Sequence, residues 1–368
     1  MQIESGQKVD SLVRGLDRTW RISPAGKYLI EFDMNKATMK ATLLQTKGRG
    51  TETDPYQIAT TADLQSMQDR LVNGQTTYFK LMDDINMTGK GWWPLNANFF
   101  GNSFSEGYGK HVSLDGNNHI IKNLTIAAND ENTDETGFFG TLVGSVQNLG
   151  LWNITVQGGS TSSVGGLAGR TGDAEDENAS ATINGVYVSG TIDAEDGTAG
   201  ALIGTIMSNT TISNSYTCAA VQGNGTIGDM IGSVEGQYDF QRSYSAGKAN
   251  GSQANSLIGG GNILKISYPF YNGSNQQEIC STVSKWEGWN SNGTIGNGWP
   301  ILNWQVEHGS YTTFCGYVND DEVGIGGIDN SQSATRNDAE AIYDLSGRKV
   351  NRVQKGLYIV NGKKVAVE

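Results

Sequence analysis

The sequence predicts an all-β chain whose main part is a parallel β-helix, and three observations support this fold class. Glycine accounts for 50 of the 368 residues and proline for only 5, without a collagen-like period. Charged residues make up 17% of the chain, too few for a long helix or a coiled coil. Short apolar runs separated by glycine and asparagine recur about every 28 residues with a fixed glycine, which is the pattern of stacked β coils.

Charge and terminal sequence limit the partners and the location. A net charge of −12 argues against a general nucleic-acid binder. No apolar run is long enough to span a membrane. Met1 to Ser5 have neither the basic start nor the apolar run of a signal peptide, so we expect that the true N-terminus precedes the given chain. Cys218, Cys280 and Cys315 match no metal-binding spacing and are expected to be buried as small apolar side chains.

Residues 1–46 are predicted to form a partial β-sandwich-like hairpin segment. Alternating apolar residues over 28–32 and again over 39–43 indicate one hairpin. A single hairpin of this size cannot bury its own core, so it should pack on another part of the protein. The sequences of 24–28 and 32–35 resemble the last hairpin of immunoglobulin-like modules in Bacteroidetes surface glycan-binding proteins.

A short helix is predicted between this segment and the β coils. Thr60 is the expected N-cap, and Asp63 stands at the capping-box position. Leu64, Met67 and Leu71 form one apolar stripe. A stack of coils exposes an open sheet edge at each end, and this helix is a natural cap for the first edge.

Five repeat cores align and define two columns of equivalent residues. The cores end in glycines spaced by 29, 35, 28 and 27 residues: Gly140, Gly169, Gly204, Gly232 and Gly259. Each core also carries one apolar residue that is predicted to stack inside the coils: Phe138, Leu167, Leu202, Met230 and Leu257. The glycines are expected to permit tight corners or close backbone approach. A second column follows each core: Gly150, Tyr187, Tyr216, Tyr244 and Tyr268.

The repeat cores resemble GLUG motifs, which are named for a Gly-Leu-x-Gly core. The segment Gly166-Leu167-Ala168-Gly169 matches this core, whereas Ala201 and Asp229 depart from it before the apolar residue. The resemblance implies a right-handed β-helix of the pectin-lyase-like kind, in proteins of bacterial surfaces.

The likeness to this family extends beyond the cores. The lead-in segments 50–58, 81–87 and 114–124 resemble its first coils, and 298–304 resembles its closing phrase. The resemblance therefore covers residues 48–306.

Residues 341–368 are predicted to form a separate small β module, after a strand and linker over 307–340. The module carries 6 Lys and Arg residues against 2 acidic ones, opposite in sign to the whole chain. Turns at 346–347 and 361–362 indicate two hairpin-like units. The module resembles the C-terminal sorting domain of type IX secretion in Bacteroidetes, which implies the secretion machinery as a partner. A purely structural β module is the alternative.

No catalytic residue, no metal ligand and no cofactor is assigned from the sequence. The three histidines share no ligand spacing, and the G-x-G-x-x-G match at 223–228 leads into a repeat core rather than a nucleotide-binding helix. Acidic residues gather at 130–135, 173–177 and 193–196. Three interpretations stay open for them: solvated loop charge, a calcium site, or the paired carboxylates of a glycosidase.

The tyrosine column is the candidate binding site. Facing outward, the four tyrosines would form a flat ladder suited to stacking on sugar rings or to contacting a partner protein. Facing inward, they would be core. The neighbours of Tyr187 are both valine and those of Tyr244 are both serine, so the sequence leaves the orientation open.

The favoured function is a non-catalytic secreted or cell-surface β-solenoid for adhesion, with an extracellular glycan or a host or bacterial surface protein as partner. The first alternative is a polysaccharide lyase or glycoside hydrolase on the same scaffold, because related folds host such enzymes. The second is a purely structural surface spacer.

Overall fold

The computed structural model describes residues 47–96, 110–127, 135–159, 162–172, 179–250, 257–262, 276–290 and 299–308, and also the backbone of strands near both ends. The chain separates into two compact units, Met1–Tyr317 and Val318–Glu368.

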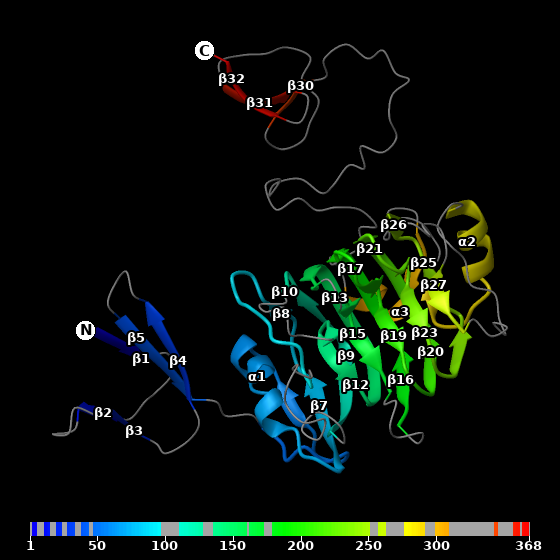
Figure 1. Cartoon of the computed structure of the whole chain (residues 1–368). Helices are drawn as coiled ribbons and strands as arrows, with labels where there is room; N and C mark the ends of the chain where they lie inside the picture. Colours follow the sequence, from blue (N-terminus) through cyan, green and yellow to red (C-terminus); the bar gives the residue numbers. More distant parts are fainter. Residues whose placement is uncertain are drawn as a thin grey trace. The chain divides into compact units, whose positions relative to one another are not determined.

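The larger unit is built on a parallel β-helix whose main sheet has 13 strands (Figure 1). Neighbouring strands in this sheet all run parallel. The strands are β6 (Tyr56–Ile58), β7 (Gln75–Leu81), β8 (Ile85–Asn86), β9 (Lys110–Lys122), β10 (Thr125–Ala127), β13 (Gly144–Gln157), β16 (Ala181–Asn184), β17 (Tyr187–Asp193), β20 (Thr210–Ser213), β21 (Tyr216–Gln222), β24 (Tyr238–Gln241), β25 (Tyr244–Ser245) and β26 (Lys248–Asn250).

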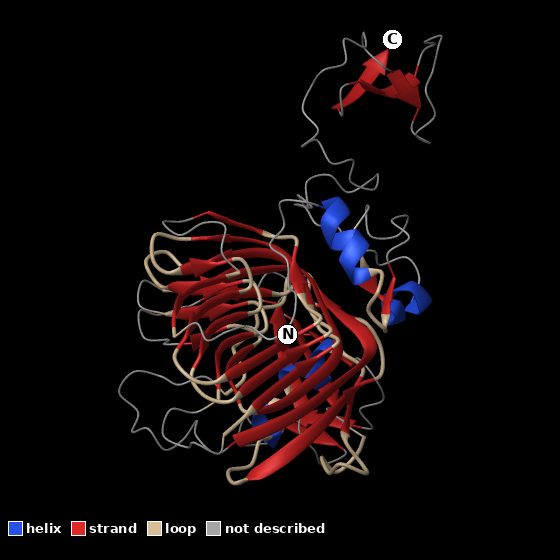
Figure 2. Cartoon of the chain, turned by 90° about the vertical axis from the view of Figure 1, so that its right-hand side faces the viewer, coloured by secondary structure: helices blue, strands red, loops and turns tan. Residues whose placement is uncertain are grey.

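Two narrower parallel sheets complete the coils (Figure 2). The first contains β11 (Glu135–Thr136), β14 (Ser163–Gly165), β18 (Thr198–Gly200) and β22 (Ile227–Gly228). The second contains β12 (Phe139–Leu142), β15 (Ala168–Thr171), β19 (Ile203–Ile206), β23 (Ile231–Val234) and β27 (Ile258–Gly261). The predicted all-β parallel β-helix is confirmed.

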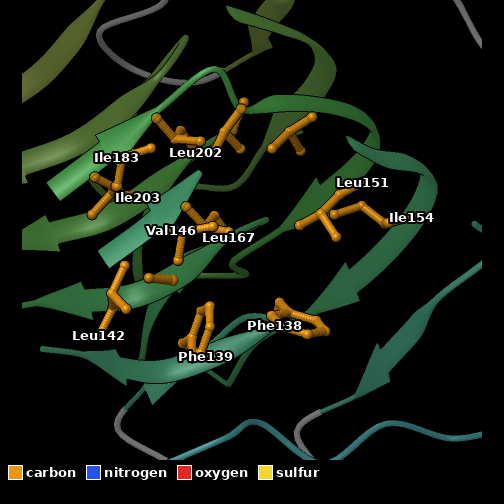
Figure 3. Packing of buried hydrophobic residues seen from close by; sticks show 14 of the residues in the cluster. Phe138, Phe139, Leu142, Val146, Leu151, Ile154, Leu167, Ile183, Leu202 and Ile203 are labelled. Carbon is orange, nitrogen blue, oxygen red and sulfur yellow. The ribbon is translucent and has the colours of Figure 1, made fainter. Parts of the chain in front are cut away.

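The repeat cores form the corners between these two narrow sheets. The predicted apolar column is buried, and Figure 3 shows Phe138, Leu167 and Leu202 pointing into the coil interior. Backbone hydrogen bonds link each corner to the next, for example from Leu167 N to Leu202 O (3.0 Å) and from Leu202 N to Met230 O (2.9 Å). Equivalent apolar residues therefore stack coil upon coil, as the repeat predicts.

The glycines that open the second and third repeat cores are required because the chain folds back on itself at these corners. A Cβ atom on Gly165 would overlap the carbonyl oxygen of Ala168, and one on Gly200 would overlap that of Ile203. Asp229, which departs from the motif, is buried, and its Oδ1 accepts a hydrogen bond from Ala249 N on β26 (2.8 Å). The departure therefore ties the corner to a neighbouring strand.

The predicted N-terminal helix is shorter than expected. α1 spans Thr61–Gln65 with the predicted capping box between Thr60 and Asp63, and a 3-10 turn follows at Gln68–Arg70. The α-helix ends where the Ser66 hydroxyl donates to Asp63 O (2.7 Å), which competes with the regular helical pattern. The apolar stripe of the sequence prediction is nevertheless buried in the solenoid core.

Small sheets flank the β-helix in the sequence. Near the N-terminus, β4 (Tyr28–Asp33) and β5 (Thr38–Leu43) form the predicted hairpin, and β1 (Gln2–Ser5) pairs with β5. Two further strands pair with each other: β2 (Ser11–Arg14) and β3 (Trp20–Ser23).

The C-terminal unit contains one of the two hairpins predicted for it. β31 (Gly356–Val360) and β32 (Lys363–Val367) form one predicted hairpin. β30 (Ile342–Asp344) pairs with β31, so the three strands form one antiparallel sheet. The turn predicted at 346–347 lies outside the described residues.

A segment that the sequence did not predict to be helical lies against the side of the coils (Figure 2). It consists of α2 (Gln276–Val283), β28 (Trp289–Asn290), β29 (Ile301–Leu302) and α3 (Asn303–His308), and we call it the covering segment. None of the described helices is long and apolar enough to cross a membrane. Cys218 on β21 is buried as expected, but it is disulfide-bonded, and Cys280 is only partly buried, which corrects the expectation for it. Cys315 lies outside the described residues.

Candidate functional site

The tyrosine column exists as a stack on the main sheet. Gly150, Tyr187, Tyr216 and Tyr244 are register partners on successive coils. The ring centroids of Tyr187 and Tyr216 lie 5.0 Å apart, and those of Tyr216 and Tyr244 lie 5.2 Å apart, with nearly parallel planes in the second pair. Tyr268 lies outside the described residues.

The tyrosines point away from the coil interior, yet they are fully buried. Val188 belongs to the interior cluster, whereas its neighbour Tyr187 belongs to a second cluster formed with the covering segment. Trp289 packs on the column, with its ring centroid 5.7 Å from that of Tyr216. The side chains of Tyr187, Tyr216 and Tyr244 are 0% exposed. An exposed ladder for sugar stacking at these three residues is therefore wrong, because the covering segment occupies the face that a ligand would need.

The tyrosine hydroxyls anchor the covering segment. Tyr216 Oη donates to Gln305 Oε1 (2.8 Å), and Tyr244 Oη donates to the carbonyl oxygen of Pro300 (2.5 Å). Burial raises the pKa of both phenols well above the ordinary value, and the neighbouring tyrosine and cysteine groups raise it further. The phenols therefore stay protonated at neutral pH and continue to donate these hydrogen bonds.

Two residues before each member of the tyrosine column lies a residue in a left-handed turn, and we call this set the asparagine column. Its backbone φ angles are 65°, 52°, 68°, 46° and 44° at Asn118, Asn148, Gly185, Asn214 and Arg242 respectively. Asparagine and glycine adopt this conformation with the least strain. The turn requirement thus explains why asparagine recurs at the same place in the repeat.

Side-chain hydrogen bonds run along this edge of the sheet. Asn214 Nδ2 donates to Asn184 Oδ1 (2.8 Å), and Arg242 Nε donates to Asn214 Oδ1 (2.8 Å). One coil therefore orients the amide or guanidinium group of the next.

A cleft of about 610 Å³ separates this edge from the covering segment. One wall consists of Asn118, Asn148, Asn184, Gly185, Asn214 and Arg242. The opposite wall comes from 285–288 and 302–304, and it includes the half-buried indole of Trp286. Trp304 Nε1 donates to Gly185 O (3.3 Å) and closes the floor between the walls.

The cleft offers amide donors and acceptors on one side and an indole on the other. Both kinds of group suit a ligand with many hydroxyls and a ring face, because amides pair with hydroxyls and indoles pack on flat apolar surfaces. Three charged side chains also line it: Arg242, Lys285 and Glu287. We take this cleft as the candidate binding site.

Several acidic residues named from the sequence have hydrogen-bond partners where they are described. Asp193 accepts from Gln222 Nε2 (2.6 Å) and Asp196 accepts from Asn224 Nδ2 (3.1 Å), in both cases from the next coil. Residues 130–134 and 173–177 lie outside the described part. Within that part, no three His, Cys, Asp or Glu side chains are grouped closely enough to hold a metal ion.

Sequence reasoning missed the cleft, although one signal was available. The asparagine column follows the same repeat register as the tyrosines and could be aligned with them. The opposite wall carries no repeat, so nothing in the period indicates that the segment from Lys285 to Gly288 faces these asparagines.

Comparisons with known proteins give partial likenesses. No family model matches the chain. Halomucin of Haloquadratum walsbyi is 31% identical over 173 residues, which is 46% of this chain and 2% of that protein. A protein of Evansella cellulosilytica named "Putative Gly-rich membrane protein" is 36% identical over 134 residues, 33% of this chain and 14% of that protein. The chain thus spans a small fraction of the length of these relatives.

One solved structure shares a partial likeness with the fold. It is named as a "putative immunoglobulin A1 protease" from Bacteroides ovatus, with 20% sequence identity and a TM-score of 0.48. The match covers 70% of this chain and 94% of that one.

Proposed function

We propose that the chain is a non-catalytic, secreted or cell-surface β-helix protein that binds an extracellular glycan in the cleft beside its asparagine column. The observation that carries the proposal is the pairing of the two walls. Amide groups repeat along the coil axis at the spacing of neighbouring strands, about 4.8 Å, and an indole from the covering segment lines the same cleft. A linear chain of sugars presents hydroxyls and ring faces in a similar repeating way.

Three features support a location outside the cell. Cys218 is disulfide-bonded, and disulfides persist mainly in oxidising compartments. One relative is named as a membrane protein. The likeness of the repeats to GLUG surface proteins and of the tail to type IX sorting domains agrees with this location. We further propose that the type IX secretion machinery exports the protein and that glycan binding needs no cofactor. Calcium binding at the acidic loops stays a prediction.

The tail is tested in the native host. The full gene is expressed with and without residues 341–368, and intact cells are treated with protease. Loss of surface exposure without the tail supports a sorting role, and unchanged exposure contradicts it.

The glycan proposal is tested with the full chain on a glycan array and by calorimetry with the best oligosaccharide found there. Trp286→Ala should lower affinity about tenfold or more, because it removes the indole from the cleft wall. Trp93→Ala is the matched control, since Trp93 is 42% exposed and does not line the cleft.

Three results would contradict the proposal. They are a wild-type chain that binds no glycan, equal affinities for both tryptophan variants, or release of new reducing ends from bound oligosaccharide. The last result would favour the lyase or hydrolase alternative.

A further inference from the structure

We infer that the cleft selects glycans that carry carboxylates, so that its ligands are acidic sugars. This inference rests on the proposed function and adds the chemical class of the ligand. Two cationic side chains, Arg242 and Lys285, line opposite walls of the cleft, against the single carboxylate of Glu287. The whole chain has a net charge of −12, so the excess of positive charge at the cleft is opposite in sign to the net charge of the chain.

Arg242 occupies a position where the turn favours a different residue. The other coils place Asn118, Asn148, Gly185 or Asn214 in this left-handed turn, and those residue types tolerate it best. Arg242 adopts φ 44° without that advantage. Backbone strain of this kind tends to occur where the side chain has a function. The strained backbone at Arg242 thus indicates that its cationic side chain has a function in the cleft.

The guanidinium of Arg242 is also oriented for recognition. Its Nε donates to Asn214 Oδ1 (2.8 Å), which restrains the group and leaves its terminal nitrogens available. Among the described residues, no carboxylate forms an ion pair with Arg242. Two terminal nitrogens in one plane match the two oxygens of a carboxylate.

Lys285 and Trp286 supply the complementary contacts on the opposite wall. Lys285 is exposed and is the second residue after α2, and Trp286 comes next with its indole held edge-on against Trp289 (5.7 Å between ring centroids). Because Arg242 and Lys285 line the same cleft as this indole, a sugar ring packed on it would bring its carboxylate into a cleft with two cations. A peptide carboxylate would use the cations but would leave the amide column without hydroxyl partners, so an acidic glycan is the better fit.

Glu287 makes the inference testable in both directions. Its carboxylate opposes an anionic ligand, so Glu287→Gln should raise affinity for an acidic glycan, whereas Lys285→Gln should lower it. For Arg242 the best substitution is Arg242→Asn, because other coils carry asparagine at this turn and the backbone conformation is kept. A loss of affinity in Arg242→Asn with unchanged thermal stability therefore reports on recognition rather than folding.

The experiment uses the full chain and an array on which oligosaccharides of glucuronic, galacturonic and sialic acid stand beside their carboxyl-reduced counterparts. We expect at least about tenfold tighter binding of the acidic member of a pair, reduced about tenfold by Arg242→Asn and weakened by added salt. Glu287→Gln should raise the affinity severalfold. Neutral counterparts should bind all variants alike.

The outcomes separate the two levels of the proposal. Equal binding of acidic and carboxyl-reduced members overturns the carboxylate inference and leaves the glycan function standing. Binding of neither member overturns both. An affinity for acidic glycans that none of the three charge variants changes places recognition elsewhere and also overturns the inference.

Discussion

Two columns of this protein repeat with the same period and are buried by different means. The column of Leu202 points into the coils and is covered by the coils themselves. The column of Tyr216 points out of the coils and is covered by the covering segment, which contains no repeat. The sequence repeat therefore predicts which residues stack on one another. Whether the tyrosine column is exposed to solvent depends on the covering segment, which lies outside the repeat.

The first prediction attacks the inner column. Leu202→Asp places an unpartnered charge at a position that is 0% exposed, and we expect a loss of ~4 kcal/mol or more in the free energy of unfolding. Urea denaturation followed by circular dichroism measures it. Thr182→Asp is the control, because Thr182 is exposed on β16 and should change stability little. Similar losses in both variants would contradict the inward placement of Leu202.

The second prediction concerns alkaline pH and the outer column. Burial raises the folded-state pKa of Tyr187, Tyr216 and Tyr244, whereas the unfolded chain ionises near pH 10. The folded state therefore keeps protons that the unfolded state loses, so stability is fully present below pH 10 and falls as pH rises above it. Above pH 10, each tyrosine that stays protonated in the folded state should lower the free energy of unfolding by ~1.4 kcal/mol per pH unit.

Denaturation curves at pH 9 and pH 11, with tyrosinate absorbance, measure this effect. The Tyr216→Phe variant should show a shallower decline than the wild type, because one ionisable group is missing. Equal slopes would show that Tyr216 ionises normally in the folded protein.

The sequence predicts the repeating part of this protein well, because equivalent positions of successive repeats contact one another in stacked coils. The repeat pattern therefore also predicts the tertiary contacts. The period placed Leu167 and Leu202 in one interior column, and it placed Tyr187 and Tyr216 in one register. It left the direction of the tyrosines open, since both faces of that strand are apolar or small.

The covering segment and the cleft could not be predicted in the same way. The contact between Tyr216 and Gln305 joins residues 89 positions apart, and no repeat relates them. The α-helical state of α2 is also weakly signalled, because its eight residues carry one short apolar pair, Ile279 and Val283, which is buried against the coils.

A third prediction tests the tight corners of the inner column. A Cβ atom on Gly204 would lie 2.5 Å from Val164 N and 2.6 Å from Gly169 O, both backbone atoms that cannot move aside easily. Gly204→Ala should therefore cost about 1–3 kcal/mol in unfolding free energy. Gly91→Ala is the matched control, since nothing lies within 4 Å of its added Cβ. Equal thermal midpoints for the two variants would show that the corner is wider than described.

The smallest expected effect concerns one hydroxyl of the outer column. Tyr216→Phe removes the hydrogen bond to Gln305 but keeps the ring stack, so we expect a loss of about 1 kcal/mol. Tyr78→Phe, on a half-buried residue of β7 away from the covering segment, serves as the control. Amide hydrogen exchange should become faster in the covering segment of the Tyr216 variant alone. Faster exchange throughout the coils would instead indicate a role in the solenoid core.

The most direct test of the account is the solvent accessibility of the tyrosine column in the native protein. Hydroxyl-radical footprinting with mass spectrometry measures the oxidation of each tyrosine side chain, and the half-exposed Tyr238 provides an internal reference. We expect strong protection of Tyr187, Tyr216 and Tyr244 relative to Tyr238, because the covering segment buries them. Oxidation of these three residues at the rate of Tyr238 would contradict it and would restore the exposed ladder.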